Sequence, residues 1–279
     1  MSFADALAAV ERKAAAAIKT EDGDYMKDGL LHCGKCNTPK QCCIEVFGAI
    51  RKPPCLCKCA VEAREKEAEE RRQREFADRV QRYRSMGFPE SEMSKWTFAA
   101  DDGSNPKMTN AMQNYVQHFE TFRKQGKGLL LFGDVGTGKT FLAACVANAL
   151  IDKGVPCLVT NFARIANTVQ GLFEGRQEYY DSLNKFPLLV LDDLSAERKT
   201  EYMQEIVFNV IDARYRAKLP LIITTNLTRQ ELQNPSDITY QRIYSRLFEM
   251  CTPIEVAGAD RRHAALKNDI AATKQLLGL

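Results

Sequence analysis

The feature that most constrains this chain is a glycine-rich stretch directly after a short apolar run. Residues 129–132 are continuously apolar, and Gly133-Asp134-Val135-Gly136-Thr137-Gly138-Lys139-Thr140 follows them. Apolar residues then recur at helical spacing through Leu150. The pattern G-x-x-x-x-G-K-T between a strand and a helix is typical of a loop that binds nucleotide phosphates.

Each residue type in this loop has a chemical reason. Glycine lets the backbone approach a phosphate closely and point N–H groups at it. Lys139 supplies a charge to the β- and γ-phosphates, and Thr140 a hydroxyl to Mg²⁺. The expected nucleotide site comprises Gly133, Asp134, Val135, Gly136, Thr137, Gly138, Lys139, Thr140 and Phe141. The alternative is an ordinary glycine-rich turn, and the agreement of spacing, Lys-Thr pair and flanking elements counts against it.

Composition places this loop in a globular protein with a sizeable core. The 279 residues are 45% hydrophobic and 27% charged, with a formal net charge of +3. A charge so near balance argues for neither nucleic acid nor membrane, so any DNA contact has to be local. No apolar run approaches the roughly 18 residues of a membrane span, and no secretion signal opens the chain. We therefore expect a cytoplasmic protein with no membrane partner.

Seven cysteines crowd between residues 33 and 59. In a reducing compartment, such clustering indicates metal rather than disulfides. A C-x-x-C pair and a second pair about twenty residues later can complete a tetrahedral Zn²⁺ site. The preferred ligands are Cys33, Cys36, Cys57 and Cys59. Cys55 is an alternative, Cys42, Cys43 and His32 are weaker candidates, and unrelated reduced cysteines are the competing interpretation.

The remaining sequence divides around these two features. Residues 1–59 are expected to hold an N-terminal helix and the zinc-binding module, 60–94 a charged linking helix, and 95–279 the nucleotide-binding domain. Residues 1–20 are alanine-rich, and their helix is either a frayed terminus or a docking helix for a partner. Interleaved Glu, Arg and Lys in 60–84 indicate a solvated helix that docks at its carboxyl-terminal end, rather than a basic nucleic-acid stripe.

Short apolar runs alternate with helix-period segments after residue 128. Strands are expected at 129–132, 156–160, 188–191, 221–225 and 253–256. The alternation predicts an α/β fold, with a parallel five-stranded sheet between helices. Ligands bind such sheets at the carboxyl ends of strands. The glycine-rich loop, Asp192-Asp193 and Asn226 all fall at such ends.

These polar residues suit phosphoryl chemistry. Asp192 is placed to hold Mg²⁺ with Thr140, Asp193 to orient or deprotonate an attacking water, and Asn226 to position the same water. Aspartates that only cap the following turn are the alternative. Arg242 and Arg246 lie one helical turn apart; such an arginine is either a solvated surface charge or a cation for the γ-phosphate of a neighbouring subunit.

The ordered series GDVGTGKT, LLVLDDLSAE, IITTNLT, RIYSRLFE and ADRR, over residues 95–265, resembles AAA+ P-loop ATPases of the DnaC/DnaI type. These proteins help load the replicative DNA helicase, and the IstB transposition ATPases are their relatives. The cysteine segment resembles the helicase-loader branch, including phage and prophage members. The resemblance implies that Asp192 and Asp193 are Walker B, Asn226 is sensor 1, Arg246 is the arginine finger and Arg262 is sensor 2.

The resemblance also implies a function: an ATPase that uses ATP and Mg²⁺ and helps load a hexameric replicative helicase. Single-stranded DNA and self-association through AAA+ domains would belong to that role. The DNA is implied near residues 162–180, where Arg164, Arg176, Tyr179 and Tyr180 are chemically suited. Most AAA+ proteins carry Glu where Asp193 stands, which implies slow, assembly- or DNA-stimulated hydrolysis. Few residues follow Val256, which implies the truncated lid that the loaders share.

Two alternatives remain open at this point. One is an IstB-like transposition helper ATPase, which would bind duplex DNA and a transposase. The other is an ATP-gated adaptor that does not hydrolyse the nucleotide.

Overall fold

The computed structural model describes residues 20–46, 48–88, 92–194, 200–235, 237–261 and 273–277. Two compact units are formed, Met1–Ala77 and Asp78–Leu279. The expected helix over 1–20 lies almost wholly outside the described residues, as do Arg262 and most of the expected lid. Among the described helices, none combines the length and apolar character needed to cross a membrane.

The described residues of the first unit include two antiparallel hairpins and the clustered cysteines. Its strands are β1 (Tyr25–Lys27), β2 (Leu30–His32), β3 (Ile44–Val46) and β4 (Ala49–Arg51). The Asp24 carboxylate accepts hydrogen bonds from the N–H groups of Glu21 and Gly34 and pairs with Lys40 at 2.6 Å. Of the described hydrophobic side chains in this unit, the buried ones are Cys33 and Cys57. Thiols, rather than aliphatic side chains, therefore form its centre.

Helix α2 (Lys58–Gly87) contains the boundary between the two units. Side chains in its middle are exposed, with ion pairs at helical spacing such as Glu69 with Arg72. In its last turn, Arg84 donates a 2.8 Å hydrogen bond to the side chain of Asn148 and pairs with Asp152. The helix ends at Gly87, before the residue 94 at which the linking segment was expected to end.

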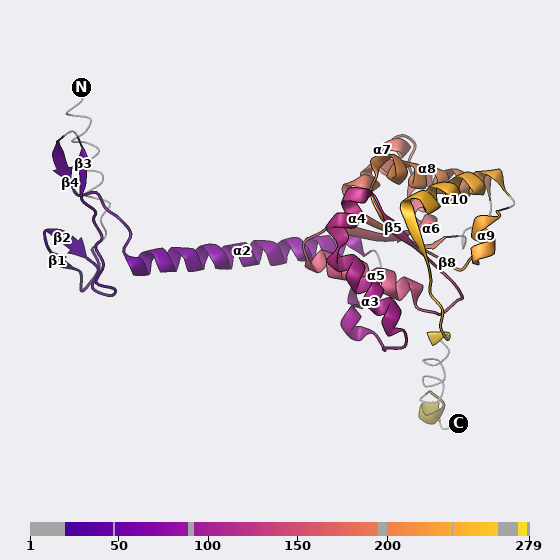
Figure 1. The fold of residues 1–279 in the computed structure, drawn as a ribbon, viewed down its shortest axis with the longest axis horizontal. Coiled ribbons are helices and arrows are strands. Elements are labelled where there is room, and N and C mark those ends of the chain that lie inside the picture. The colour runs from indigo at the N-terminus through magenta and orange to yellow at the C-terminus, as the bar shows by residue number, and fades with distance from the viewer. Residues whose placement is uncertain are drawn as a thin grey trace. The chain divides into compact units, whose positions relative to one another are not determined.

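The second unit is built on the predicted five-stranded parallel sheet (Figure 1). Its strands are β5 (Gly128–Phe132), β6 (Cys157–Asn161), β7 (Leu188–Leu194), β8 (Leu221–Thr225) and β9 (Cys251–Glu255), in the order β6-β7-β8-β5-β9. The last strand begins at Cys251 rather than at Pro253. Proline is tolerated inside β9 because β9 is an edge strand that pairs only with β5 in the sheet.

Helices cover both faces of this sheet. Successive side chains of a strand point to opposite faces, so alternate residues belong to two separate hydrophobic cores. Leu129 and Leu131 pack toward α3 (Pro106–Gln117), α4 (Phe119–Gln125) and α5 (Lys139–Asp152). Leu130 and Phe132 pack on the opposite face. The elements that cover that face are α6 (Phe162–Gln170), α7 (Arg176–Ser182), α8 (Glu201–Ala217), α9 (Arg229–Gln233) and α10 (Ile238–Met250). The described residues of this unit also form three short 3-10 helices: η1 (Met93–Lys95), η2 (Phe98–Ala100) and η3 (Leu183–Lys185).

Candidate functional site

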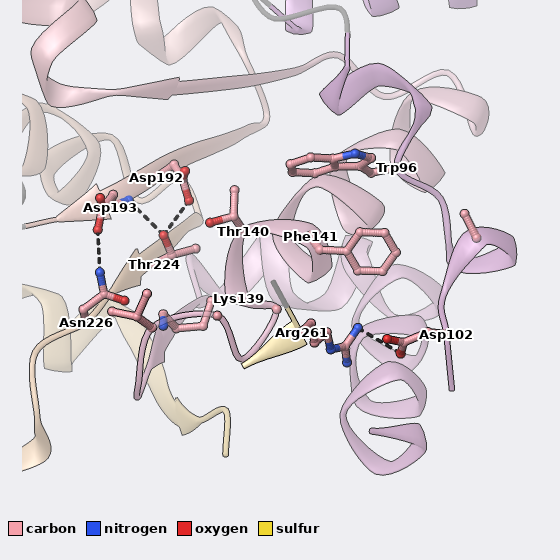
Figure 2. A pocket seen from close by; sticks show the side chains of 14 residues that line it. Trp96, Asp102, Lys139, Thr140, Phe141, Asp192, Asp193, Thr224, Asn226 and Arg261 are labelled. Atoms are coloured by element: carbon pink, nitrogen blue, oxygen red, sulfur yellow. Dashed lines mark hydrogen bonds and ion pairs between the residues drawn. The ribbon is translucent and has the colours of Figure 1, made fainter. Parts of the chain in front are cut away.

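The glycine-rich loop runs from the carboxyl end of β5 to the first turn of α5 (Figure 2). Gly138 precedes α5 with a φ of 93°, a left-handed conformation that glycine adopts without strain. Gly136 has a φ of 81°, and a Cβ atom there would lie 1.8 Å from Oδ1 of Asp260. The loop thus requires glycine at 138 for its left-handed backbone, and glycine at 136 so that Asp260 can approach closely.

Lys139 is buried at the centre of this loop. Its Nζ donates hydrogen bonds to the carbonyl oxygens of Gly133 at 2.9 Å and Asp134 at 2.6 Å. The Thr137 hydroxyl donates to the Asp134 carbonyl at 3.0 Å. The first N–H groups of α5 have no acceptor within the helix, which makes this end a ready anion site. The loop therefore gathers one ammonium group and several N–H donors at the end of β5.

Asp192 and Asp193 lie at the carboxyl end of β7, where its pairing with β8 is irregular. Leu191 pairs with Ile223 and Leu194 pairs with Thr225, so both aspartates stand opposite the single residue Thr224. Asp193 has a φ of 58°, a left-handed backbone that Asp and Asn adopt more readily than other side-chain-bearing residues. The irregularity turns two successive carboxylates toward the pocket, where a regular strand would point them to opposite faces.

Asn226 follows β8, and its side-chain amide reaches the second aspartate. Nδ2 of Asn226 donates to Oδ1 of Asp193 at 3.1 Å. The Thr224 hydroxyl donates to Oδ1 of Asp192 at 2.6 Å and accepts from the N–H of Asp193 at 2.8 Å. The ends of β7 and β8 are thus joined by side-chain hydrogen bonds.

These groups line one cavity of about 450 Å³. That volume lies within the roughly 300–1,000 Å³ typical of small-molecule sites. Of the residues named from sequence, those at its wall are Val135, Gly136, Gly138, Lys139, Thr140, Phe141, Asp192, Asp193 and Asn226. The carboxylate of Asp192 and the hydroxyl of Thr140 are oxygen donors of the kind that Mg²⁺ prefers. The residues present therefore fit a nucleotide with Mg²⁺.

The other residues of the cavity wall were not predicted as site residues: Trp96, Ala100, Asp102, Thr224 and Arg261. Trp96 lies beside the predicted Phe141, with ring centroids 6.1 Å apart. Asp102 comes from the segment before α3. Arg261 lies across the loop, with its N–H donating to the carbonyl of Gly136 at 3.0 Å. The motif ADRR was the available signal for Arg261, because it places two arginines side by side.

The Arg261 side chain forms ion pairs with Asp101 at 3.1 Å and Asp102 at 3.2 Å. Its guanidinium carbon lies 3.1 Å from the position that a Cβ on Gly138 would occupy. A cation therefore rests directly on the glycine-rich loop, held there by two carboxylates. Arg262, which the resemblance assigned to this region, lies outside the described residues.

Arg246 stands away from this cavity, on α10 facing α8. It pairs with Asp212 at 3.0 Å, and its guanidinium carbon lies 4.6 Å from the ring centroid of Phe208. Arg246 lines a shallow groove together with Arg242, Ser245 and Glu249. The structure thus places Arg246 on a surface where it cannot serve the phosphate loop of its own chain.

The four preferred cysteines converge. One sulfur atom from each of Cys33, Cys36, Cys57 and Cys59 lies within 4.8 Å of the others. The sulfurs of Cys33 and Cys59 are 3.6 Å apart, and those of Cys57 and Cys59 are 3.4 Å apart. A tetrahedron with Zn–S bonds of about 2.3 Å has sulfur–sulfur edges of about 3.8 Å. The spacing therefore fits a structural Zn²⁺ ion, and Cys55, Cys42 and Cys43 are not part of the group.

Electrostatics of this cluster also suit a cation. Hydrogen bonds from the Thr38 hydroxyl and the Cys59 backbone lower the pKa of the Cys36 thiol to about 5. The neighbouring thiols of Cys57 and Cys33 raise the pKa of the Cys59 thiol to about 12. Cys36 therefore favours the thiolate, the form in which cysteine binds a metal, whereas Cys59 keeps its proton unless a metal ion displaces it.

Residues 162–180, where DNA contacts were expected, do not expose the two tyrosines that were named as suited to stack on bases. Tyr180 is buried in the core, and Tyr179 packs against that core. Phe173, in the turn between α6 and α7, is instead fully exposed. Arg164 and Arg176 are exposed on α6 and α7. A base could stack on Phe173, whereas Tyr180 is inaccessible.

Comparison with known proteins agrees with this geometry. The sequence profile of the family described as IstB-like ATP binding protein matches residues 61–268. The replicative helicase loader DnaI of Bacillus subtilis is 26% identical over 181 residues, 60% of this chain and 58% of DnaI. The replicative helicase loader DnaC of Escherichia coli is 27% identical over 127 residues, 44% of this chain and 52% of DnaC.

An insertion-sequence ATP-binding protein of Sinorhizobium fredii is 34% identical over 126 residues, 43% of this chain and 41% of that protein. The chain thus spans about half the length of these curated relatives.

Solved structures give the same fold. A crystal structure of DnaI superposes with a TM-score of 0.52 at 26% identity, covering 64% of this chain and 99% of that one. A structure of the DnaC helicase loader gives 0.51 at 23% identity, covering 60% and 99%. The fold is that of AAA+ helicase loaders, and the profile match extends over most of the sequence. The chain belongs to the family of IstB-like ATP-binding proteins.

Proposed function

We propose that this protein is an ATP-dependent loader of a hexameric replicative DNA helicase. The observation that carries the proposal is the similarity to the replicative helicase loader DnaI, which extends over 60% of this chain. The cysteine cluster ahead of the nucleotide-binding unit adds support, because the same segment resembles the loader branch of the family. In this proposal, the N-terminal segment and zinc module bind the helicase, and the second unit binds ATP and single-stranded DNA.

The cavity residues have distinct roles in this proposal. The N–H groups of the glycine-rich loop bind the phosphates, and Lys139 exchanges its contacts with Gly133 and Asp134 for phosphate oxygens. Thr140 and Asp192 hold Mg²⁺, which neutralises charge on the phosphates when it is bound. Asp193 orients the attacking water and accepts its proton, while Asn226 holds that carboxylate in place.

Hydrolysis in this proposal requires assembly. Arg246 lies in the groove of α8 and α10, from which it would reach the γ-phosphate of an adjacent copy. Its contacts with Asp212 and Phe208 hold the guanidinium in one orientation before that encounter. Turnover by isolated chains is therefore expected to be slow.

Single-stranded DNA is assigned to the exposed part of α6 and α7. Arg164 and Arg176 supply charges for phosphates, and Phe173 supplies an exposed ring on which a base can stack. Tyr180 is not included because it is buried.

A transposition helper is the second candidate. It is favoured by the IstB-like family match and by the 34% identity to an insertion-sequence ATP-binding protein. The deciding experiment is a pull-down in ATP with the purified replicative helicase of the host and, separately, with a purified IS21-type transposase. Retention of the helicase alone supports the loader. Retention of the transposase alone, together with preference for duplex DNA, overturns it.

A further inference from the structure

Two buried threonines at the end of β8 take the hydrogen bonds that the irregular end of β7 would otherwise leave unmade. Where Asp192 and Asp193 face the single residue Thr224, the regular ladder between the strands is interrupted. The Thr224 hydroxyl accepts from the N–H of Asp193 at 2.8 Å, and the Thr225 hydroxyl donates to the carbonyl of Leu194 at 2.8 Å. Both threonines are buried, so water cannot readily replace the protein groups to which their hydroxyls are hydrogen-bonded.

The two hydroxyls differ in what else they touch. Besides the strand backbone, Thr224 contacts Oδ1 of Asp192 at 2.6 Å. A hydroxyl has one proton, and a backbone N–H cannot accept it, so the proton of Thr224 points at the carboxylate. Among the described residues, the printed partners of the Thr225 hydroxyl are backbone groups, the carbonyl of Leu194 and the N–H of Leu227. One hydroxyl is therefore joined to a carboxylate of the cavity, and its neighbour is not.

We propose that Thr224 is a positioning residue that sets both aspartates of the site through one hydroxyl. Its hydrogen bond fixes the orientation of the Asp192 carboxylate and leaves the second oxygen of that group for Mg²⁺. Its acceptance of the Asp193 N–H holds the left-handed backbone from which the Asp193 side chain reaches Asn226. The inference rests on the proposed ATP-dependent function and assigns it a residue outside the phosphate loop.

Thr224→Val tests this role because valine keeps the shape of threonine and lacks the hydroxyl. Trp96 is the only tryptophan of the chain and lines the cavity, so its fluorescence reports nucleotide binding. The probe is a non-hydrolysable ATP analogue, titrated without metal and then at increasing Mg²⁺. Mutation of a residue that hydrogen-bonds to a metal ligand typically lowers metal affinity or activity by roughly 10–100-fold. The Mg²⁺ concentration for half-saturation should rise by that factor in Thr224→Val, with metal-free affinity unchanged.

Two further variants separate positioning from simple weakening of β8. Thr224→Ser restores the hydroxyl and should return the Mg²⁺ half-saturation and kcat to within about threefold of wild type, well inside the roughly 10–100-fold loss. Thr225→Val removes an equally buried hydroxyl that binds no carboxylate, and should lower thermal stability without moving the Mg²⁺ dependence. If Thr224→Val does not fold, Thr224→Ala, which only removes atoms, carries the same expectation.

An unchanged Mg²⁺ half-saturation in Thr224→Val would overturn the inference, as would an equal shift in Thr225→Val. Absence of any nucleotide response of Trp96 in the wild-type protein would instead defeat the proposed function. The two failures are therefore distinguishable in one titration series.

Discussion

Asn226 donates a 3.1 Å hydrogen bond from its side-chain amide to Oδ1 of Asp193. The bond links the ends of two neighbouring strands at the wall of the nucleotide cavity. Because Asp193 has a left-handed backbone, the short carboxylate is the acidic side chain best suited to this position. Asp193 stands where the resemblance to AAA+ proteins leads one to expect glutamate, and Asn226 orients its carboxylate.

Asp193→Asn should separate nucleotide binding from turnover. Asparagine tolerates the same backbone and still accepts the hydrogen bond from Asn226, but it cannot take a proton from water. Loss of a general base typically costs 10²–10⁴-fold, so kcat should fall roughly 10²-fold while ATP affinity is kept. Asp192→Asn is the matched variant. It should lower kcat and also weaken Mg²⁺ binding, so that more Mg²⁺ is needed for half-saturation. Equal Mg²⁺ effects in both variants would contradict the division of roles.

Arg246 is predicted to act on a neighbouring copy. Arg246→Ala should bind ATP normally and lose turnover in the assembled state, by up to roughly 10³-fold for an arginine finger. Arg242→Ala, one turn earlier on α10, is the control and should retain most activity.

Mixing Arg246→Ala with Lys139→Ala provides the sharper test of the same role. Each variant alone should be inactive, but a mixed assembly should contain sites with Lys139 from one chain and Arg246 from the next. Turnover should therefore reappear on mixing. If Arg246 serves only to pack α10 on Asp212 and Phe208, mixing restores nothing.

Arg261 is predicted to contact the nucleotide, given that it lines the cavity and rests on Gly138. Hydrogen bonds to charged groups contribute about 1.5–3 kcal/mol, so Arg261→Ala should weaken ATP binding by roughly tenfold or more. The measurement is the ratio of ATP to ADP affinity, which a loss of packing alone leaves constant. Arg262→Ala is the parallel variant. A larger effect there would favour the role that resemblance gives to Arg262.

Metal content tests the cysteine cluster. Purified protein should contain about one zinc per chain, and Cys36→Ser should abolish it, whereas Cys42→Ser, outside the cluster, should not. Structural zinc supplies roughly 10–16 kcal/mol of apparent binding energy, so chelation should unfold the first unit. The Trp96 signal for nucleotide should persist, since that residue lies in the second unit. Zinc-free protein in which all seven thiols of residues 33–59 react freely would defeat the assignment.

The parts of the site that were predictable from sequence are those defined by spacing and by strand ends. The glycine-rich loop, Asp192, Asp193 and Asn226 meet at one edge because parallel strands end together. The convergence of the four cysteines was predictable because a C-x-x-C pair and a second pair about twenty residues later have the spacing of zinc ligands. Such patterns are local, and each carries its own chemical reason.

The parts that were not predictable depend on tertiary contacts. Thr224 is an unremarkable β-branched residue until the pairing of β7 and β8 shows two aspartates opposite it. Arg214 is one of several basic residues near the end of α8, yet it is fully buried. Its guanidinium donates to the backbone carbonyls of Leu183, Phe186, Pro187 and Pro220. No periodicity indicates which arginine meets unpaired carbonyls.

Helicase loading itself tests the proposed function most directly. The host's hexameric helicase is incubated with closed circular single-stranded DNA and ATP, and DNA-bound helicase is measured after separation by size. Wild-type protein should increase the bound fraction, and Lys139→Ala, which lacks the ammonium for the phosphates, should not. An increase that is equal with Lys139→Ala, or no increase with the wild-type protein, would contradict an ATP-dependent loader.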